Sequence, residues 1–128
     1  MREAISNMLF GSARPGYCSE HVPRHQIDEW IQNVKAHGIK SIICLLDDEQ
    51  LAYYDSLPVS LPKYYALHGF EVRHVPVRDR KRPPLTPAQM ERVVEHYRRL
   101  PKPVLVHCSA GCDRTGHVID YIRKHLDG

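Results

Sequence analysis

The residues best suited to covalent chemistry stand at positions 107–116, where the sequence reads His-Cys-Ser-Ala-Gly-Cys-Asp-Arg-Thr-Gly. An apolar run at 104–106 predicts a short buried strand before Cys108, and an amphipathic run from Gly116 predicts a helix. Backbone N–H groups in a loop between a strand and a helix N-terminus can point at one anion, helped by the helix dipole. The spacing therefore predicts an anion-binding loop that begins at a thiol.

Cys108 and Arg114 supply the two groups that this loop needs for chemistry on an anion. The field of the helix N-terminus, with Arg114 nearby, favours the thiolate of Cys108 and makes it a nucleophile. The guanidinium of Arg114 is a planar fork that can hold two oxygens of a phosphate. Together they predict the attack of a thiolate on phosphorus.

Cys108, five intervening residues and then Arg114 resemble the signature loop of the cysteine-based protein tyrosine phosphatases. His107, Gly111 and the Thr-Gly pair at 115–116 also fit the pattern of that family, and the short chain points to its dual-specificity branch. The resemblance implies a metal-independent phosphatase without a cofactor. Its expected substrate is phosphotyrosine in a protein, with phosphoserine and phosphothreonine as further candidates, and its expected intermediate is a cysteinyl phosphate.

The residues between the thiol and the arginine are expected to bind phosphate mainly through their backbone N–H groups; they are Ser109, Ala110, Gly111, Cys112 and Asp113. Gly111 leaves room in the loop and can adopt a positive φ. By the resemblance, His107 holds the geometry of Cys108 through a backbone hydrogen bond. The hydroxyl of Thr115 can donate to the sulfur of Cys108 and stabilise it as a leaving group, or it can cap the following helix.

A phosphatase also needs an acid that protonates the departing oxygen, and Asp79 is the preferred candidate. It follows a predicted strand and precedes Cys108 by 29 residues, which resembles the dual-specificity pattern. The alternative acid is Asp113, inside the loop, where a carboxylate repels phosphate unless it is protonated or points away. The opposing interpretation of Asp79 is a solvated carboxylate among arginines.

Two features leave the substrate open. Asp113 departs from the usual pattern and resembles broad-specificity bacterial phosphatases and myotubularin-type lipid phosphatases, so a phosphoinositide or small phosphoester is the alternative substrate. The basic residues around Asp79 are either solvated or attract a substrate with several negative groups; they are Arg78, Arg80, Lys81 and Arg82. A non-catalytic phosphate-binding module or a redox protein is less favoured, because Cys108 and Arg114 are both present and redox proteins more naturally use Cys-x-x-Cys.

Cysteines stand at positions 18, 44, 108 and 112, and the N-terminus lacks the apolar segment of a secretory signal. The thiols are therefore expected to be reduced. A second cysteine near a reactive thiolate can form a reversible disulfide with it, so Cys44 or Cys112 could protect Cys108 from further oxidation. A zinc site at His107, Cys108 and Cys112 lacks a fourth ligand and the usual spacing, so no metal is expected.

The 128 residues are expected to form a single domain over 1–128, in the cytoplasm and as a monomer. The net charge of +3 suits an anionic substrate, either a phosphorylated protein or a small phosphoester. It is too small and too dispersed to indicate a nucleic acid. No apolar run is long enough to predict a membrane span.

Three runs predict buried strands, at 39–46, 70–77 and 103–107, and helical patterns separate them. Alternation of this kind predicts an α/β domain of three layers, with a central, mostly parallel sheet of about four to five strands and helices on both faces. Ligands of such sheets bind at the carboxyl ends of the strands. The phosphate-binding loop, between the last strand and the last helix, lies at that edge.

Four helical segments are expected around these strands, or five if the stretch 47–69 holds two short helices. The first ends at Gly38, and a short one begins near Pro62 and stops before Gly69. A third begins with a capping box at Thr86, and the fourth follows the loop. Their inward residues recur at helical spacing: Ile27, Trp30, Ile31 and Val34 in the first, Met90, Val93, Val94 and Tyr97 in the third, and Val118, Ile119, Ile122 and Leu126 in the fourth.

Overall fold

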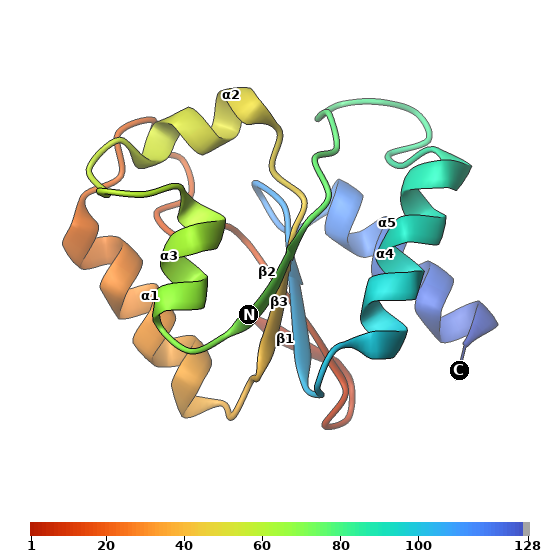
Figure 1. Cartoon of the computed structure of the whole chain (residues 1–128). Helices are drawn as coiled ribbons and strands as arrows, with labels where there is room; N and C mark the ends of the chain where they lie inside the picture. Colours follow the sequence, from red (N-terminus) through yellow and green to blue (C-terminus); the bar gives the residue numbers. More distant parts are fainter. Residues whose placement is uncertain (127–128) are drawn as a thin grey trace.

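The computed structural model describes residues 1–126, which form a five-stranded sheet between two layers of helices (Figure 1). The strands are β1 (Arg2–Ile5), β2 (Leu9–Ser12), β3 (Ser41–Cys44), β4 (Glu71–His74) and β5 (Val104–His107). The helices are α1 (Arg24–Ala36), α2 (Asp48–Leu51), the 3₁₀ helix η1 (Ala52–Tyr54), α3 (Leu61–Leu67), α4 (Pro87–Arg99) and α5 (Asp113–His125). Helices α1 and α3 cover one face of the sheet, and α4 and α5 cover the other. The predicted three-layer α/β class is confirmed.

The order of the strands is β1-β2-β5-β3-β4, and the last four run parallel to one another. Parallel strands are covered on both faces and therefore read as continuous apolar runs, which is why β3 and β5 are recognisable in the sequence. The carboxyl ends of β2, β5, β3 and β4 meet at one edge. The loops that follow these strands come together there.

The strands predicted at 39–46 and 70–77 were too long, because the ladder covers only four residues of each run, 41–44 and 71–74. Beyond it the chain continues extended, with single backbone hydrogen bonds from Leu45 to His107 and from Val77 to Leu45.

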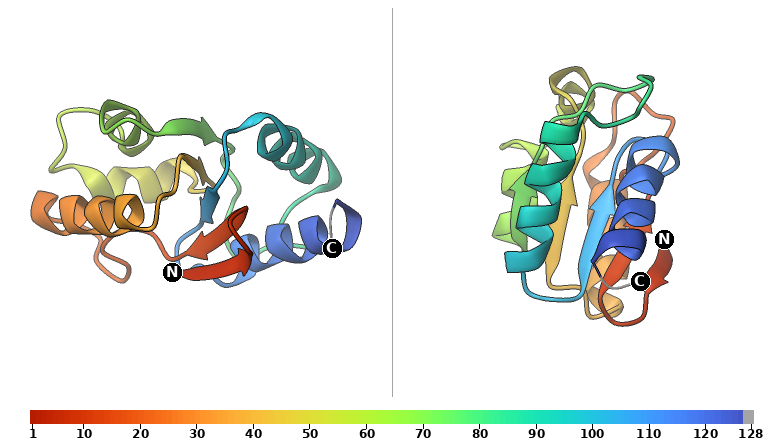
Figure 2. Two further views of the ribbon diagram at one scale, coloured as in Figure 1. Left: turned by 90° about the horizontal axis from the view of Figure 1, so that it is seen from below. Right: turned by 90° about the vertical axis from the view of Figure 1, so that its right-hand side faces the viewer.

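The hairpin of β1 and β2 was missed. Its outer strand begins with the exposed Arg2 and Glu3 and is only half-buried at Ala4 and Ile5, and its turn contains Asn7 at a φ of 59°. The inner strand contributes only a short apolar stretch before Gly11, which gives no distinct alternation. Strand β2 of the hairpin pairs with β5 and lies beside α5, so the hairpin forms one edge of the sheet (Figure 2).

The predicted helices are confirmed, with one difference at the loop. Helix α1 ends before Gly38, whose φ is 75°, and Thr86 and Gln89 form the expected capping box of α4. Helix α5 begins at Asp113 rather than at Gly116. Its first turn therefore belongs to the loop.

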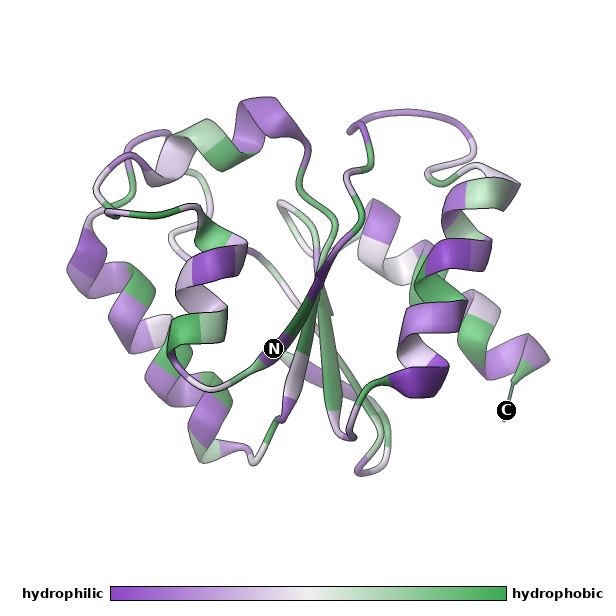
Figure 3. Cartoon of the chain, viewed as in Figure 1, coloured by the Kyte–Doolittle hydropathy of each residue, from purple (hydrophilic) through white to green (hydrophobic). Residues whose placement is uncertain are grey.

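The core consists of two apolar clusters, one on each face of the sheet. Side chains of β5 alternate between them: Val104 and Val106 pack under α4 and α5, whereas Leu105 packs under α1 and α3. In Figure 3 the central strands are coloured mainly as apolar, whereas the helices mix apolar and polar residues. None of the helices within residues 1–126 is long and apolar enough to cross a membrane.

Candidate active site

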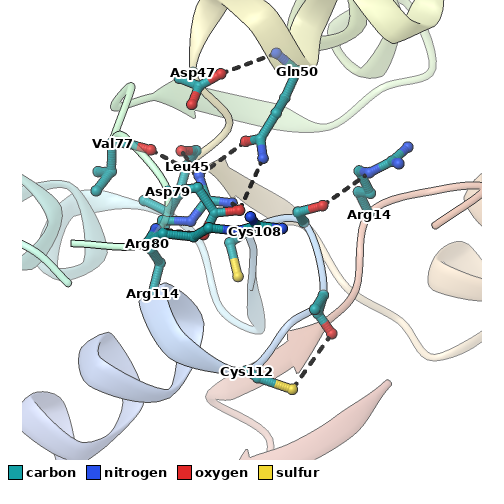
Figure 4. A network of polar contacts seen from close by, with 12 residues as sticks. Arg14, Leu45, Asp47, Gln50, Val77, Asp79, Arg80, Cys108, Cys112 and Arg114 are labelled. Carbon is teal, nitrogen blue, oxygen red and sulfur yellow. Dashed lines mark hydrogen bonds and ion pairs between the residues drawn. The ribbon is translucent and has the colours of Figure 1, made fainter. Parts of the chain in front are cut away.

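Cys108 directly follows β5 and lies at the floor of a cavity of about 390 Å³. Its side chain is 2% exposed, and Figure 4 shows the sulfur inside the curve of the loop. The cavity is lined by the loop, by the segments after β2 and β3, and by the segment after β4; the lining residues are Arg14, Tyr17, Cys18, Glu20, Gln50, Tyr53, Asp79, Arg80, Cys108, Ser109, Ala110, Cys112 and Asp113.

Carbonyl groups of the loop are held on its outer side. The oxygen of Ser109 accepts a hydrogen bond of 2.9 Å from the backbone N–H of Arg14, and the oxygen of Gly111 accepts one of 2.9 Å from Nη1 of Arg2. In a trans peptide the N–H of the next residue points opposite to the carbonyl. The N–H groups that follow Ser109 and Gly111 are therefore directed away from these partners and toward the inside of the loop.

Gly111 has the positive φ that the sequence predicted, at 78°. A Cβ atom at this position would lie 2.6 Å from the backbone nitrogen of Ala13 and 2.7 Å from the carbonyl carbon of Ser12. The loop thus approaches the backbone after β2 so closely that only glycine fits.

Arg114 is 1% exposed, and all its hydrogen bonds within the described residues come from Nη1. Its Nη1 contacts the carbonyl oxygens of Val77 at 2.7 Å and Leu45 at 3.2 Å, and Oε1 of Gln50 at 3.0 Å. Its Nε and Nη2 make no hydrogen bond within the described residues. A buried guanidinium whose Nε and Nη2 make no hydrogen bond can donate from both atoms to the oxygens of a bound anion.

Asp79 lies in the same cavity, as the sequence predicted for the acid. Its Oδ2 is 3.3 Å from Nη2 of Arg114, at ion-pair distance without the alignment of a hydrogen bond, and accepts from Nε2 of Gln50 at 3.1 Å. Its Oδ1 accepts from the backbone N–H of Arg80, whose φ is 60°. Asp113 also lines the cavity but is exposed at the start of α5. Asp79 is therefore the carboxylate that is fixed against the arginine.

His107 holds the backbone of the nucleophile. Its Nδ1 lies 3.1 Å from the carbonyl oxygen of Cys108, and its Nε2 lies 2.9 Å from the hydroxyl of Tyr65. Burial lowers the pKa of His107 to about 4, so the ring is neutral at pH 7. Since a carbonyl only accepts, Nδ1 carries the proton and Tyr65 donates to Nε2. Both ring nitrogens are used, and neither is free for a metal.

Thr115 is fully buried in the first turn of α5, and its Oγ1 has no hydrogen-bond partner within residues 1–126. The helix begins after Cys112, so the interpretation of Thr115 as a helix cap is wrong. Its hydroxyl therefore has an unused donor within the described residues.

The other cysteines differ in their position relative to Cys108. Cys44 is aligned with His107 across β3 and β5, but its side chain packs in the cluster under α1 and α3, whereas Cys108 belongs to the opposite cluster. Burial raises the pKa of the Cys44 thiol to about 12. Cys112 and Cys18 are exposed and line the cavity of Cys108.

A second cavity of about 680 Å³ adjoins the first, and Gln50, Tyr53, Asp79 and Arg80 line both. Its wall carries charges of both signs, from the basic loop after β4 and from the start of α2: Arg78, Arg80, Asp47, Asp48 and Glu49. The arginines beside Asp79 therefore face a cavity next to the nucleophile.

Three residues of the site had no sequence signal, because each acts through contacts that are distant along the chain. Arg14 is buried and donates from Nε to Oγ of Ser109. Gln50 bridges Asp79 and Arg114, and Tyr65 of α3 bonds to His107 of β5.

In this three-layer fold, the loop after the central strand carries a buried thiol and a buried arginine with unused hydrogen-bond donors. This combination defines the class of cysteine-based phosphatases. Residues 18–125 match the family model described as "Tc-R-P: Polymorphic toxin system, DSP-PTPase phosphatase". The chain belongs to this family.

Known proteins agree with this class. The human tyrosine-protein phosphatase non-receptor type 18 is 49% identical in an alignment 49 residues long, and this alignment covers 34% of this chain and 11% of that protein. A putative phosphatase (DUF442) from Shewanella putrefaciens CN-32 superposes with a TM-score of 0.64 at 18% identity. The superposition covers 99% of this chain and 73% of the phosphatase chain. The kinase-associated phosphatase, with its catalytic cysteine replaced by serine, gives a TM-score of 0.61 at 18% identity, covering 90% and 66%. The chain thus spans about a tenth of the curated relative, and the two structures support the fold.

Proposed function

We propose that this chain hydrolyses phosphotyrosine in proteins, with phosphoserine and phosphothreonine as further substrates, through a phosphate ester of Cys108. The observation that carries the proposal is that Nε and Nη2 of buried Arg114 make no hydrogen bond within the described residues. They lie next to a loop around the thiol, in which the carbonyl groups of Ser109 and Gly111 are bonded on the outer side. Such an arrangement stabilises the charge that develops on the equatorial oxygens of a phosphoryl group.

In the first step, the sulfur of Cys108 attacks phosphorus while Arg114 and the N–H groups of residues 109–113 bind the phosphoryl oxygens. The bond from phosphorus to the leaving oxygen breaks, and Asp79 donates its proton to that oxygen. The fixed position of Asp79 beside Arg114 supports this role. Asp113, exposed on the rim of the cavity, is the alternative acid.

In the second step, Asp79 takes a proton from a water molecule that attacks the cysteinyl phosphate. The sulfur–phosphorus bond breaks, its electron pair returns to Cys108, and inorganic phosphate leaves. The unpartnered hydroxyl of Thr115 supports a role as donor to the departing sulfur. No metal or other cofactor takes part in this scheme.

Two aromatic rings support an aryl phosphate as substrate. Tyr17 and Tyr53 line the cavity of Cys108, and the guanidinium carbon of Arg14 lies 5.8 Å and 4.8 Å from their ring centres. Aromatic side chains pack favourably against another ring, by about 0.5–1.5 kcal/mol beyond the buried area. The ring of phosphotyrosine could pack against either of them at the rim of the cavity.

A phosphoinositide or another small phosphoester is the second candidate substrate. Arg78 and Arg80 line the adjoining cavity and could bind a second anionic group of such a molecule. The carboxylates of Asp47, Asp48 and Glu49 on the same wall oppose that binding.

We also propose that Cys112 or Cys44 protects Cys108 under oxidation by peroxide, which converts the thiolate to a sulfenic acid that a second thiol can reduce to a disulfide. Cys112 is favoured, since it lines the same cavity. Peptide mapping after mild oxidation should find a disulfide at Cys108, and direct conversion to the sulfinic acid would contradict the idea. The cytoplasmic location and the monomeric state remain predictions.

The test of the proposed function is the hydrolysis of p-nitrophenyl phosphate in the presence of a chelator. The enzyme should remain active, and Cys108→Ser, with its fold checked by circular dichroism, should lose the activity. Phosphotyrosine, phosphoserine and inositol phosphates should then be compared by kcat/KM. Activity that persists in Cys108→Ser would refute the mechanism.

A further inference from the structure

Gln50 is placed between the two groups that carry the proposed chemistry. Its side-chain Oε1 accepts from Nη1 of Arg114 at 3.0 Å, and its Nε2 donates to Oδ2 of Asp79 at 3.1 Å (Figure 4). Its own backbone N–H donates to Oδ1 of Asp47, the N-cap of α2, at 3.0 Å. The residue is 7% exposed, so its amide is held in one pose.

The amide of Gln50 still has unused hydrogen-bonding capacity. A carboxamide has two N–H donors and two acceptor lone pairs, and the two contacts above use one of each. Gln50 lines the cavity above Cys108, and it is the only carboxamide among the described residues that line it. One donor and one acceptor are therefore available beside Asp79.

The second step needs a water molecule in a defined place. The water must attack phosphorus in line with the breaking bond to Cys108, and it must give a proton to Asp79. One contact to Asp79 fixes only one direction of the water. A second polar group next to Asp79 is needed to orient its lone pair.

We propose that Gln50 is a further catalytic residue, which holds the attacking water together with Asp79 during hydrolysis of the cysteinyl phosphate. The inference rests on the proposed function. In this step the water oxygen bonds to phosphorus, the sulfur–phosphorus bond breaks with its electron pair returning to Cys108, and one proton passes to Asp79. Gln50 only orients the water and exchanges no proton.

The first step depends less on Gln50. The Nη1 atom of Arg114 is also held by the carbonyl oxygens of Val77 and Leu45, so its phosphate-facing Nε and Nη2 stay in place without the amide. The hydrogen bonds of Gln50 within the described chain go to Asp47, Asp79 and Arg114, and none goes to Cys108 or to the N–H groups of the loop. Loss of the amide should therefore slow the hydrolysis of the intermediate and leave its formation nearly unchanged.

The test compares the wild type with Gln50→Leu and Gln50→Glu. The leucine variant removes both amide contacts, whereas the glutamate variant keeps an acceptor for Arg114 and lacks the N–H donor. The matched control is Gln32→Leu, the same change at an exposed position of α1. Release of p-nitrophenol is followed by stopped flow, and acid-quenched samples are analysed for phosphate on Cys108 by mass spectrometry.

Both Gln50 variants should show a burst of p-nitrophenol and accumulate phosphoenzyme, with kcat lowered at least about tenfold and kcat/KM lowered no more than about threefold. Gln32→Leu should match the wild type. Equal losses in kcat and kcat/KM without phosphoenzyme would overturn the inference. So would a wild-type kcat in Gln50→Glu, because Arg114 would then be the only relevant partner. If the wild type itself never phosphorylates Cys108, the proposed function fails instead.

Discussion

The close approach of Gly111 to the backbone after β2 allows a quantitative prediction. Gly111 and Gly38 share a left-handed backbone conformation but differ in their surroundings. Gly111 has a φ of 78° and Gly38 a φ of 75°. An added Cβ at Gly38 meets nothing within 4 Å, whereas at Gly111 it would lie 2.6–2.8 Å from backbone atoms of Ser12 and Ala13. Substitution by alanine at both positions therefore separates backbone strain from steric contact.

The left-handed conformation alone costs alanine about 1 kcal/mol, so Gly38→Ala should lower the melting temperature by about 3–5 °C. Gly111→Ala carries the same strain, and backbone atoms cannot move aside as a flexible side chain can. Overpacking adds about 1–3 kcal/mol, so the total loss should be about 2–4 kcal/mol. Differential scanning calorimetry on both variants measures these values.

Function should separate the variants more sharply. Displacing the loop at Gly111 removes or weakens at least one N–H bond to bound phosphate, worth about 1.5–3 kcal/mol for a charged partner. The inhibition constant of inorganic phosphate should rise by at least about tenfold in Gly111→Ala and stay unchanged in Gly38→Ala. Equal melting temperatures and equal phosphate inhibition in the two variants would refute the geometry of the loop.

Three further changes test other parts of the site. Asp79→Asn should lower kcat/KM for alkyl phosphates by roughly 100-fold or more and spare p-nitrophenyl phosphate, whose leaving group needs no proton; the reverse pattern in Asp113→Asn would make Asp113 the acid. Tyr65→Phe leaves Nε2 of buried His107 without its donor and should cost about 1–3 kcal/mol of unfolding free energy, measured by urea denaturation. Burial lowers the pKa of His107 from 6.5 to about 4, so the unfolded chain binds this proton at a higher pH than the folded protein does. The stability that the neutral ring contributes is therefore complete above pH 6.5 and is lost as the pH falls toward 4, by up to about 3 kcal/mol. A Tyr65→Phe protein as stable as the wild type, or a flat urea midpoint over that pH range, would contradict the assignment.

Local sequence patterns were sufficient for the parts of the site that are continuous in the chain. The strand before Cys108, the glycine that the loop requires and the arginine at its end are coded within ten residues. Asp79 could be found because a parallel sheet brings the ends of β4 and β5 to the same edge, and a loop after a strand end is a natural source of the acid.

The parts that the sequence did not predict depend on side chains that meet only after folding. Gln50 lies in a polar segment between two strands, where neither its spacing nor its neighbours indicate a role. Tyr65 reads as an apolar residue of α3, and its hydroxyl gains meaning only when β5 places His107 beside it. Arg14 appears as one of many basic residues until the fold buries it against the loop.

The predicted lengths of β3 and β4 were wrong for a related reason. Apolar runs continue through Leu46 and Val77, because these residues are buried in the core like those of the strands. Hydropathy reports burial and not pairing, so it cannot show where the ladder ends and the sheet edge opens.

The central claim is that phosphate passes through Cys108, and trapping the intermediate tests it most directly. Enzyme mixed with p-nitrophenyl phosphate in the presence of a chelator and quenched in acid within milliseconds should carry one phosphoryl group, and peptide mapping should place it on Cys108. Phosphate on another residue, or turnover by Cys108→Ser at the rate of the wild type, would contradict the account.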